Sequence, residues 1–184
     1  MGNEPVNLKT FGGVAFNWNQ VKSAKVKTGQ NGEKTYFIEF KTGVTAEYPM
    51  QKNGSMQSRE LTMWQSMDYD TETILSKLKG VKIKGSKQDD HIVAKEVEDS
   101  TIDVSGDNND DHIDVESVYR HYKYKDGTRS RDIKASKNNT LILGKDDTAT
   151  KTTKIIQKTE NGRGGLKVDE EVRTYDIEGP GIEN

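Results

Sequence analysis

Alternation of apolar and polar residues is the main pattern along the chain, and it predicts strands. Between residues 34 and 41, Tyr36, Ile38 and Phe40 fall on one face of an extended segment. Residues 21–27 alternate as well, and the loop between the two segments contains two glycines, which is typical of a β-hairpin. This first hairpin is expected to be half buried.

The same pattern predicts further extended segments. Residues 148–159 and 166–177 alternate on either side of a glycine-rich loop and predict a second hairpin. A short strand is expected at residues 43–48, directly before Pro49. Residues 6–18 also alternate and are expected to be strand-like.

Two segments have helical spacing instead. Residues 59–67 carry apolar side chains at roughly helical intervals, and residues 70–78 place Ile74, Leu75 and Leu78 on one side of a helix. We therefore expect one or two short helices within residues 59–79, where they would cover the end of a neighbouring stack of strands.

The most regular feature is a sequence repeat with three copies, at residues 83–96, 104–117 and 133–146. The first two copies share the sequence Asp-Asp-His-Ile at an offset of 21 residues. The third copy aligns to the first without gaps and matches Ile142 to Ile92, so that Thr140 stands at the position of an aspartate in the first copy.

A repeat of this length indicates that each unit is one supersecondary element stacked on the next. Because the units are strand-like, we expect an all-β fold, with a short right-handed parallel β-helix between about residues 81 and 146 and rungs about 4.8 Å apart. Residues 119–131 contain an Asp-Gly turn and are expected to form a hairpin inserted between the second and third copies.

The chain is expected to be one domain in three parts. Residues 1–80 would form a cap of a β-hairpin and short helices, residues 81–147 the repeats with the inserted hairpin, and residues 148–184 a C-terminal hairpin and tail. The 184-residue length allows one domain of ordinary size.

Composition limits both the core and the partners. Only 30% of the residues are hydrophobic and 32% are charged, which suits a narrow core. The net charge of −2 gives no overall attraction to nucleic acid or to an anionic membrane, so nucleic acid is not an expected partner. The absence of cysteine excludes disulfides and thiolate metal sites.

No stretch of 18 consecutive apolar residues is present, and the N-terminus lacks the apolar segment of a signal peptide. The sequence therefore predicts no membrane span. The protein is expected to be soluble, and either secreted without a cleavable signal peptide or cytoplasmic.

Residues 106–113 read Gly-Asp-Asn-Asn-Asp-Asp-His-Ile and resemble the glycine- and aspartate-rich nonapeptide of calcium-binding RTX proteins, and residues 85–92 are similar to it. In that family, calcium is bound between successive turns of the chain. The resemblance implies Ca²⁺ as a cofactor, with Asp90 and Asp111 as ligands and the isoleucine two positions later facing inward.

Side-chain alternation places the stacked aspartates on the side of the isoleucines and the histidines on the opposite side. Two carboxylates about 5 Å apart repel by roughly 3 kcal/mol at an effective dielectric of 20, so a cation would be favoured between them. The candidate ligands are Asp89, Asp90, Asp107, Asp110 and Asp111. His91 and His112 are candidate additional ligands, which would bring in zinc or manganese. The alternative is a solvated polar turn in which aspartates bond their own backbone.

The inserted hairpin interleaves basic and aromatic side chains, a composition typical of surfaces that bind anionic polymers. The candidate residues for an anionic partner are Tyr119, Arg120, Tyr122, Lys123, Tyr124, Lys125, Arg129 and Arg131. The alternative is a charged, solvated hairpin whose tyrosines pack on the stack.

No complete catalytic motif is present. We expect a non-enzymatic binding or interaction module of a secreted or virulence-associated bacterial or phage protein, calcium-stabilised, with a protein or an anionic polysaccharide as partner; the sequence also allows an oligomer. Two alternatives stay open. One is a small enzyme in which a metal at the aspartates and the arginines of the hairpin act on an acidic polysaccharide, and the other is a purely structural β-solenoid subunit, which would associate with itself through exposed strand edges.

Overall fold

The computed structural model describes residues 3–5, 21–49, 72–106 and 109–184, and the fold of these residues is all-β. No helix occurs within these ranges, and the strands run from β1 to β14. The strands are β1 Asn3–Pro5, β2 Val21–Thr28, β3 Lys34–Phe40, β4 Thr45–Pro49, β5 Glu72–Lys79, β6 Lys82–Lys84, β7 His91–Glu98, β8 Thr101–Asp103, β9 His112–Lys123, β10 Arg129–Lys134, β11 Thr140–Leu143, β12 Thr148–Glu160, β13 Leu166–Glu178 and β14 Gly181–Glu183.

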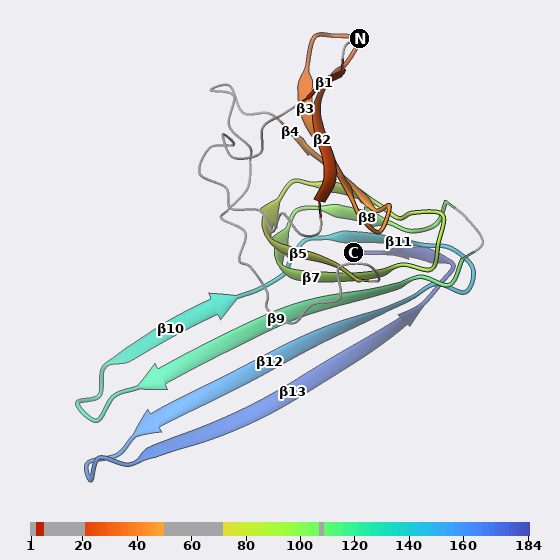
Figure 1. The fold of residues 1–184 in the computed structure, drawn as a ribbon. Helices are drawn as coiled ribbons and strands as arrows, with labels where there is room; N and C mark the ends of the chain where they lie inside the picture. The colour runs from red at the N-terminus through yellow and green to blue at the C-terminus, as the bar shows by residue number, and fades with distance from the viewer. Residues whose placement is uncertain (1–2, 6–20, 50–71, 107–108) are drawn as a thin grey trace.

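The strands form two sheets that face each other (Figure 1). One sheet has the order β1-β2-β3-β4-β6-β8-β11-β14, and the other has the order β13-β12-β9-β7-β5, with β10 paired to β9. Two ladders of parallel strands lie within them. In the first sheet, β6, β8 and β11 pair in parallel, and in the second sheet β5, β7, β9 and β12 do so.

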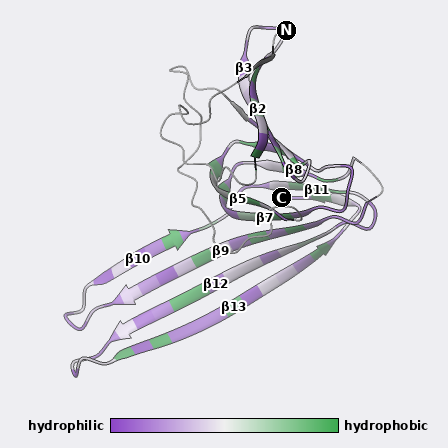
Figure 2. Ribbon diagram, viewed as in Figure 1, coloured by the Kyte–Doolittle hydropathy of each residue, from purple (hydrophilic) through white to green (hydrophobic). Residues whose placement is uncertain are grey.

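The core includes buried side chains of β3 and β4, such as Ile38 and Phe40, and continues between the two parallel ladders, where inward side chains stack in register. One buried row crosses the second sheet through Thr73, Ile92, Ile113 and Ala149. A second buried row crosses the first sheet through Ile83, Ile102 and Leu141. Apolar stretches on these central strands are visible in Figure 2. Burial of these rows fixes the strand register, because a shift by one residue would turn each aliphatic side chain outward.

A residue in the left-handed conformation, here called a corner, precedes each strand of the first ladder. Gly80, Asp99 and Asn138 stand two residues before β6, β8 and β11, with φ of 68°, 51° and 56°. Glycine, asparagine and aspartate adopt this left-handed conformation at the lowest cost. The corners are also bonded to one another, since the Gly80 amide donates to the Glu98 carbonyl at 3.0 Å and the Asp99 amide to the Lys137 carbonyl at 3.1 Å.

The sequence prediction of an all-β fold is confirmed, but the predicted parallel β-helix is not shown. The ladder of β6, β8 and β11 is only part of its sheet, because β4 pairs with β6 and β14 pairs with β11 in the antiparallel direction. These antiparallel neighbours make the first sheet a mixed sheet, in which the three parallel strands lie between β4 and β14.

The prediction of a short helix at residues 70–78 is wrong, since Glu72–Lys79 forms strand β5. Ile74 and Leu75 are consecutive and both buried, so both faces of β5 are covered. A strand covered on both faces lacks the alternation that distinguishes strands from helices. The other expected helix, at residues 59–67, and the expected strand-like segment at residues 6–18 lie outside the described residues.

The alignment of the third repeat copy also needs correction. Ile142 does not stack on Ile92; instead Leu141 pairs with Ile102, and Ala149 pairs with Ile113. The residues that correspond to Asp-Asp-His-Ile at the start of β12 are therefore Asp146, Asp147, Thr148 and Ala149, which extend past the third copy as aligned above. A gap-free alignment cannot match them, because the loop from Gly144 to Asp147 is two residues shorter than the loop from Gly85 to Asp90.

The predicted hairpins are present. Strands β2 and β3 form the first hairpin. Strands β9 and β10 form the inserted hairpin, and β12 and β13 form the C-terminal hairpin. The last two lie side by side, since β9 and β12 pair in parallel from His112 to Lys123. Together they make a four-stranded sheet, β10-β9-β12-β13, that extends beyond the two-sheet body (Figure 1). Residues 118–134 and 154–172 of these hairpins are here called the arm.

Candidate functional site

The first residues of four parallel strands form one row across the outer face of the second sheet, the face away from the core. Glu72, His91, His112 and Thr148 are neighbours in register, each at the start of its strand. Asp114 lies on the same face two residues after His112, because side chains alternate along a strand. These five residues are here called the outer row.

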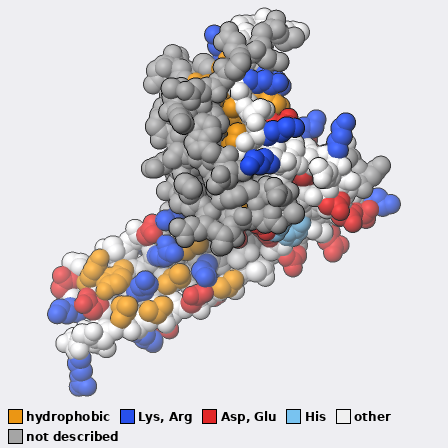
Figure 3. Space-filling view, in the orientation of Figure 1, with side chains coloured by type: hydrophobic (Ala, Val, Ile, Leu, Met, Phe, Trp, Pro, Cys, Tyr) orange, Lys and Arg blue, Asp and Glu red, His pale blue; other side chains and the backbone are white. Residues whose placement is uncertain are grey.

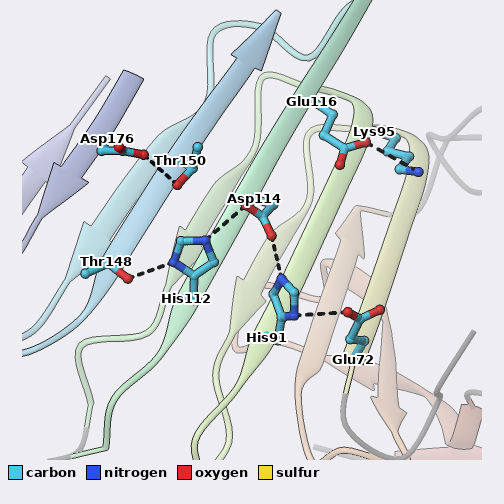
Figure 4. A network of polar contacts seen from close by, with 9 residues as sticks. All are labelled: Glu72, His91, Lys95, His112, Asp114, Glu116, Thr148, Thr150 and Asp176. Carbon is cyan, nitrogen blue, oxygen red and sulfur yellow. Dashed lines mark hydrogen bonds and ion pairs between the residues drawn. The ribbon is translucent and has the colours of Figure 1, made fainter. Parts of the chain in front are cut away.

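The side chains of the outer row form a continuous chain of polar contacts (Figure 4). His91 contacts Glu72 Oε1 through Nδ1 at 3.1 Å and Asp114 Oδ2 through Nε2. His112 contacts Asp114 Oδ1 through Nε2 at 3.0 Å and Thr148 Oγ1 through Nδ1 at 2.7 Å. Both histidines thus turn Nε2 toward the same carboxylate, and the two ring centroids lie 5.6 Å apart.

The ligand atoms of His91, His112 and Asp114 lie within 4.8 Å of one another, close enough for one metal ion. Their side chains are about one-third exposed, at 37%, 36% and 27%. The site is therefore accessible from solvent. Ile74 and Val93, which follow on the same face of β5 and β7, are buried and give it an apolar border.

The stacking of aspartate on aspartate and histidine on histidine is present as the repeat predicted, with His91 beside His112. Asp90 and Asp111 are buried, whereas Asp89 and Asp110 are exposed. Asp107 lies outside the described residues. Hence two of the predicted calcium ligands face the interior and two face solvent.

Hydrogen bonds to the backbone hold the buried aspartates. The Asp90 amide donates to Asp111 Oδ1 at 2.7 Å, and the Asp111 amide donates to Asp147 Oδ1 at 2.9 Å. The loops before β7 and β12 are bonded as well, since the Ser86 amide donates to Asp90 Oδ2 and the Gly144 amide to Asp147 Oδ2, both at 2.6 Å. These carboxylates connect each turn to the next strand, a role that explains their position without a cation.

The basic and aromatic residues of the inserted hairpin are divided between two faces of the arm. Tyr122 shares a face with Arg120, which forms an ion pair with Asp132 at 3.3 Å. On the other face, His121 and Lys123 lie opposite Arg131 and Arg129 and line a shallow hollow of about 340 Å³. Tyr119 is on this second face, and Tyr124 and Lys125 belong to the tip.

Local contacts at the tip explain two pKa shifts. Partial desolvation, followed by the nearby charges of Glu160 and Tyr124, raises the pKa of the Tyr122 hydroxyl. The Thr128 hydroxyl and amide donate to the Asp126 carboxylate at 2.6 and 2.9 Å and lower its pKa. The Asp126 shift belongs to the tight turn that Gly127 allows with its φ of 88°.

Sequence reasoning missed Glu72, Asp114, Thr148 and Asp147. Asp114 could have been found, because it follows His112 at the two-residue spacing that puts both side chains on one face of a strand. Glu72 was assigned to a helix, and the shorter third loop concealed Thr148 and Asp147. Their positions depend on pairing between distant strands.

Within the described residues, no helix is long and apolar enough to cross a membrane. No protein-family model, no curated protein and no solved structure matches the chain.

Proposed function

We propose that the chain is a non-enzymatic interaction module that assembles with further copies of itself through the arm. The observation that carries the proposal is that the arm is a single layer. None of its residues is buried, and β10 and β13 are open edges, with no neighbour on their outer sides within the described residues. A layer of this kind is marginally stable alone and offers unpaired backbone groups to another strand.

Exposed apolar side chains gather on the arm. Of the seven large hydrophobic residues exposed in the described part of the chain, five belong to it, namely Tyr124, Ile133, Leu166, Val168 and Val172. Figure 3 shows hydrophobic side chains between charged ones on one face of this region. Burying them against a partner would be favourable, at about 25 cal/mol per Å² of apolar area.

The charges of the two edges favour a second copy as the partner. Strand β10 carries three basic residues and one acidic residue, whereas β13 from Leu166 to Val172 carries one basic and three acidic residues. Pairing β10 with β13 of another copy therefore brings opposite charges together. Pairing like edges would set like charges opposite each other, which destabilises a sheet.

The strand directions are compatible with this arrangement. Strands β10 and β13 are antiparallel to β9 and β12, which are parallel to each other, so β10 and β13 run the same way. Copies related by rotation about an axis along the arm would join by parallel pairing of β10 with β13. Such a contact uses two different surfaces, and it generates a ring if the rotation closes.

Exchange of edge charges tests the proposal. The variant Glu170→Lys/Glu171→Lys makes both edges basic, and Arg129→Glu/Arg131→Glu makes both edges acidic. Each variant alone is expected to be monomeric in analytical ultracentrifugation, whereas an equimolar mixture is expected to assemble, because the unlike edges match again. The wild-type assembly is expected to weaken with added salt.

The control is Lys82→Glu/Lys87→Glu, which changes two exposed charges outside the arm and should leave assembly unchanged. A wild-type chain that stays monomeric at every concentration would contradict the proposal. Assembly of either charge-exchange variant on its own would also contradict the proposal. The ion pairs lost in the variants, such as Lys154 with Glu170 at 3.3 Å, are exposed and are worth little to folding.

A metal-assisted enzyme acting on an acidic polysaccharide is less well supported. Arg120 lies eight residues beyond His112 along β9, roughly 26 Å at about 3.3 Å per residue, so it does not share a site with the aspartates. A hollow of about 870 Å³ lies over the first sheet, and Lys82, Lys84 and Lys87 are among the residues that line it. Neither Asp90 nor Asp111 lines it.

The body that carries the arm is proposed to be a short stack of coils, the β-helix that the repeat predicts. Support comes from the two parallel ladders and from the left-handed corners at Gly80, Asp99 and Asn138. Calcium stabilisation and a role outside the producing cell stay predictions. Calcium binding would show as a higher melting temperature in calcium than in a chelator.

A further inference from the structure

We propose that His91, His112 and Asp114 bind one divalent transition-metal ion of the zinc class on the outer face of β7 and β9. The site goes beyond the interaction function, and it differs from the predicted calcium turn, whose aspartates face the interior or the loop ends. Its three ligands come from two neighbouring parallel strands, so a bound ion would pin two successive repeats together.

The positions of the ligand atoms suit a small ion. In a tetrahedral site with bonds of about 2.0–2.1 Å, the ligand atoms are about 3.3 Å from one another. Here His112 Nε2 is 3.0 Å from Asp114 Oδ1, and His91 Nε2 contacts the other oxygen of the same carboxylate. All three ligand atoms lie within 4.8 Å, so small side-chain rotations suffice to admit the ion.

The second ring nitrogens supply an independent observation. His91 Nδ1 is 3.1 Å from Glu72 Oε1, and His112 Nδ1 is 2.7 Å from Thr148 Oγ1. With a proton on Nδ1, each ring donates to its outer oxygen and leaves the Nε2 lone pair directed at the common point. Histidine ligands of metals are held in this way, by a carboxylate or another oxygen on the far nitrogen.

The donor set decides the class of ion. Two imidazole nitrogens and one carboxylate suit zinc and its first-row neighbours, whereas calcium takes six to eight oxygen ligands. The carboxylates of Glu72 and Asp114 balance the two positive charges of the ion. Because the ligands are about one-third exposed, a fourth position is open to water.

The test uses the full chain, stripped with a chelator and titrated with Zn²⁺ by calorimetry and with Co²⁺ by visible absorption. We expect one ion per chain, a cobalt spectrum of four-coordinate nitrogen and oxygen ligands, and a melting temperature that rises with Zn²⁺ but not with Ca²⁺ at the same concentration. A chain that binds neither Zn²⁺ nor Co²⁺ in this way would overturn the proposal.

Variants separate this site from adventitious binding by surface histidines. His112→Gln and Asp114→Asn should abolish binding, and Glu72→Gln should weaken it about 10- to 100-fold by removing the partner of His91. The matched control is His121→Gln, which removes the third histidine of the chain, located on the arm, and should leave the affinity unchanged.

Failure of a ligand variant to fold does not remove the test, because the cobalt spectrum of the wild-type chain reports the ligands directly. Loss of the signal in His121→Gln, or its persistence in folded His112→Gln, would also contradict the proposed ligand set. None of these measurements depends on assembly through the arm, so the two proposals can fail separately.

Discussion

At the scale of single residues, the buried aspartates act as connectors between turn and strand. Asp147 is 1% exposed, and its two oxygens accept the amides of Gly144 and Asp111 at 2.6 and 2.9 Å. Hydrogen bonds of buried amides to a charged group are worth more than those between neutral groups, and a buried amide without a partner costs more still. The Asp147 carboxylate therefore fixes both its own loop and the start of the neighbouring strand β9.

Replacing Asp147 tests this role. Asp147→Asn keeps the shape but loses the charge and one acceptor, so we expect the free energy of unfolding to fall by about 1.5–3 kcal/mol. The measurement is urea denaturation followed by circular dichroism.

Asp146→Asn is the matched control, because Asp146 is exposed, and asparagine tolerates its φ of 70°. Its effect should stay within about 0.5 kcal/mol. Equal effects of both changes would contradict the connecting role.

The outer row shows how far sequence could predict the candidate site. His91 and His112 were recognised because they repeat at a fixed offset, which parallel stacking turns into contact. Glu72 and Thr148 have no such repeat signal, because neither residue is a histidine. Only strand pairing brings them into the same row. A sequence repeat predicts which identical residues lie side by side on adjacent strands. It does not predict which different residues do so.

At the scale of elements, local alternation identified the hairpins and failed at β5. A hairpin strand has one solvated face, so its apolar and polar residues alternate, as Tyr36, Ile38 and Phe40 do in β3. Strand β5 is buried on both faces, and its apolar residues Ile74, Leu75 and Leu78 fit a helix equally well. Burial on the second face depends on tertiary structure, which no local pattern records.

Deletion of one repeat tests whether the parallel strands are interchangeable. Removing residues 94–114, 21 residues and one repeat, joins Val93 to Val115. The hybrid strand keeps its alternation, with a valine at the position of Ala94. If the parallel strands are equivalent units that contact mainly their neighbours, the shortened chain is expected to fold and to melt cooperatively at a lower temperature.

The control deletion removes residues 95–114, one residue fewer. It shifts Val115 and the rest of β9 by one position, which turns inward side chains outward and should prevent cooperative folding. Both chains are compared by thermal melting and by dispersion of amide signals in nuclear magnetic resonance spectra. If the two deletions behave alike, the strands are not equivalent units.

At the scale of the whole molecule, a buried body and an exposed arm share the same strands. Strand β9 belongs to the body from His112 to Ser117, where Ile113 and Val115 are buried, and to the arm from Val118 onward. At that point β10 takes the place of β7 along the edge of β9. The arm is thus held in direction by the body, while its own stability depends on what covers it.

Removal of the arm separates the two parts. Val118 and Lys134 are paired residues, as are Lys154 and Val172, so each pair can be joined by an Asn-Gly turn without moving the body strands. We expect the shortened chain to melt cooperatively, to stay monomeric in ultracentrifugation and to bind Zn²⁺ as the full chain does, because the outer row lies in the body. A control chain keeps the arm strands and replaces only the loops 124–128 and 161–165 with Asn-Gly, and it should still assemble. Assembly of the shortened chain would place the contact outside the arm, and an unfolded shortened chain would show that the arm stabilises the body.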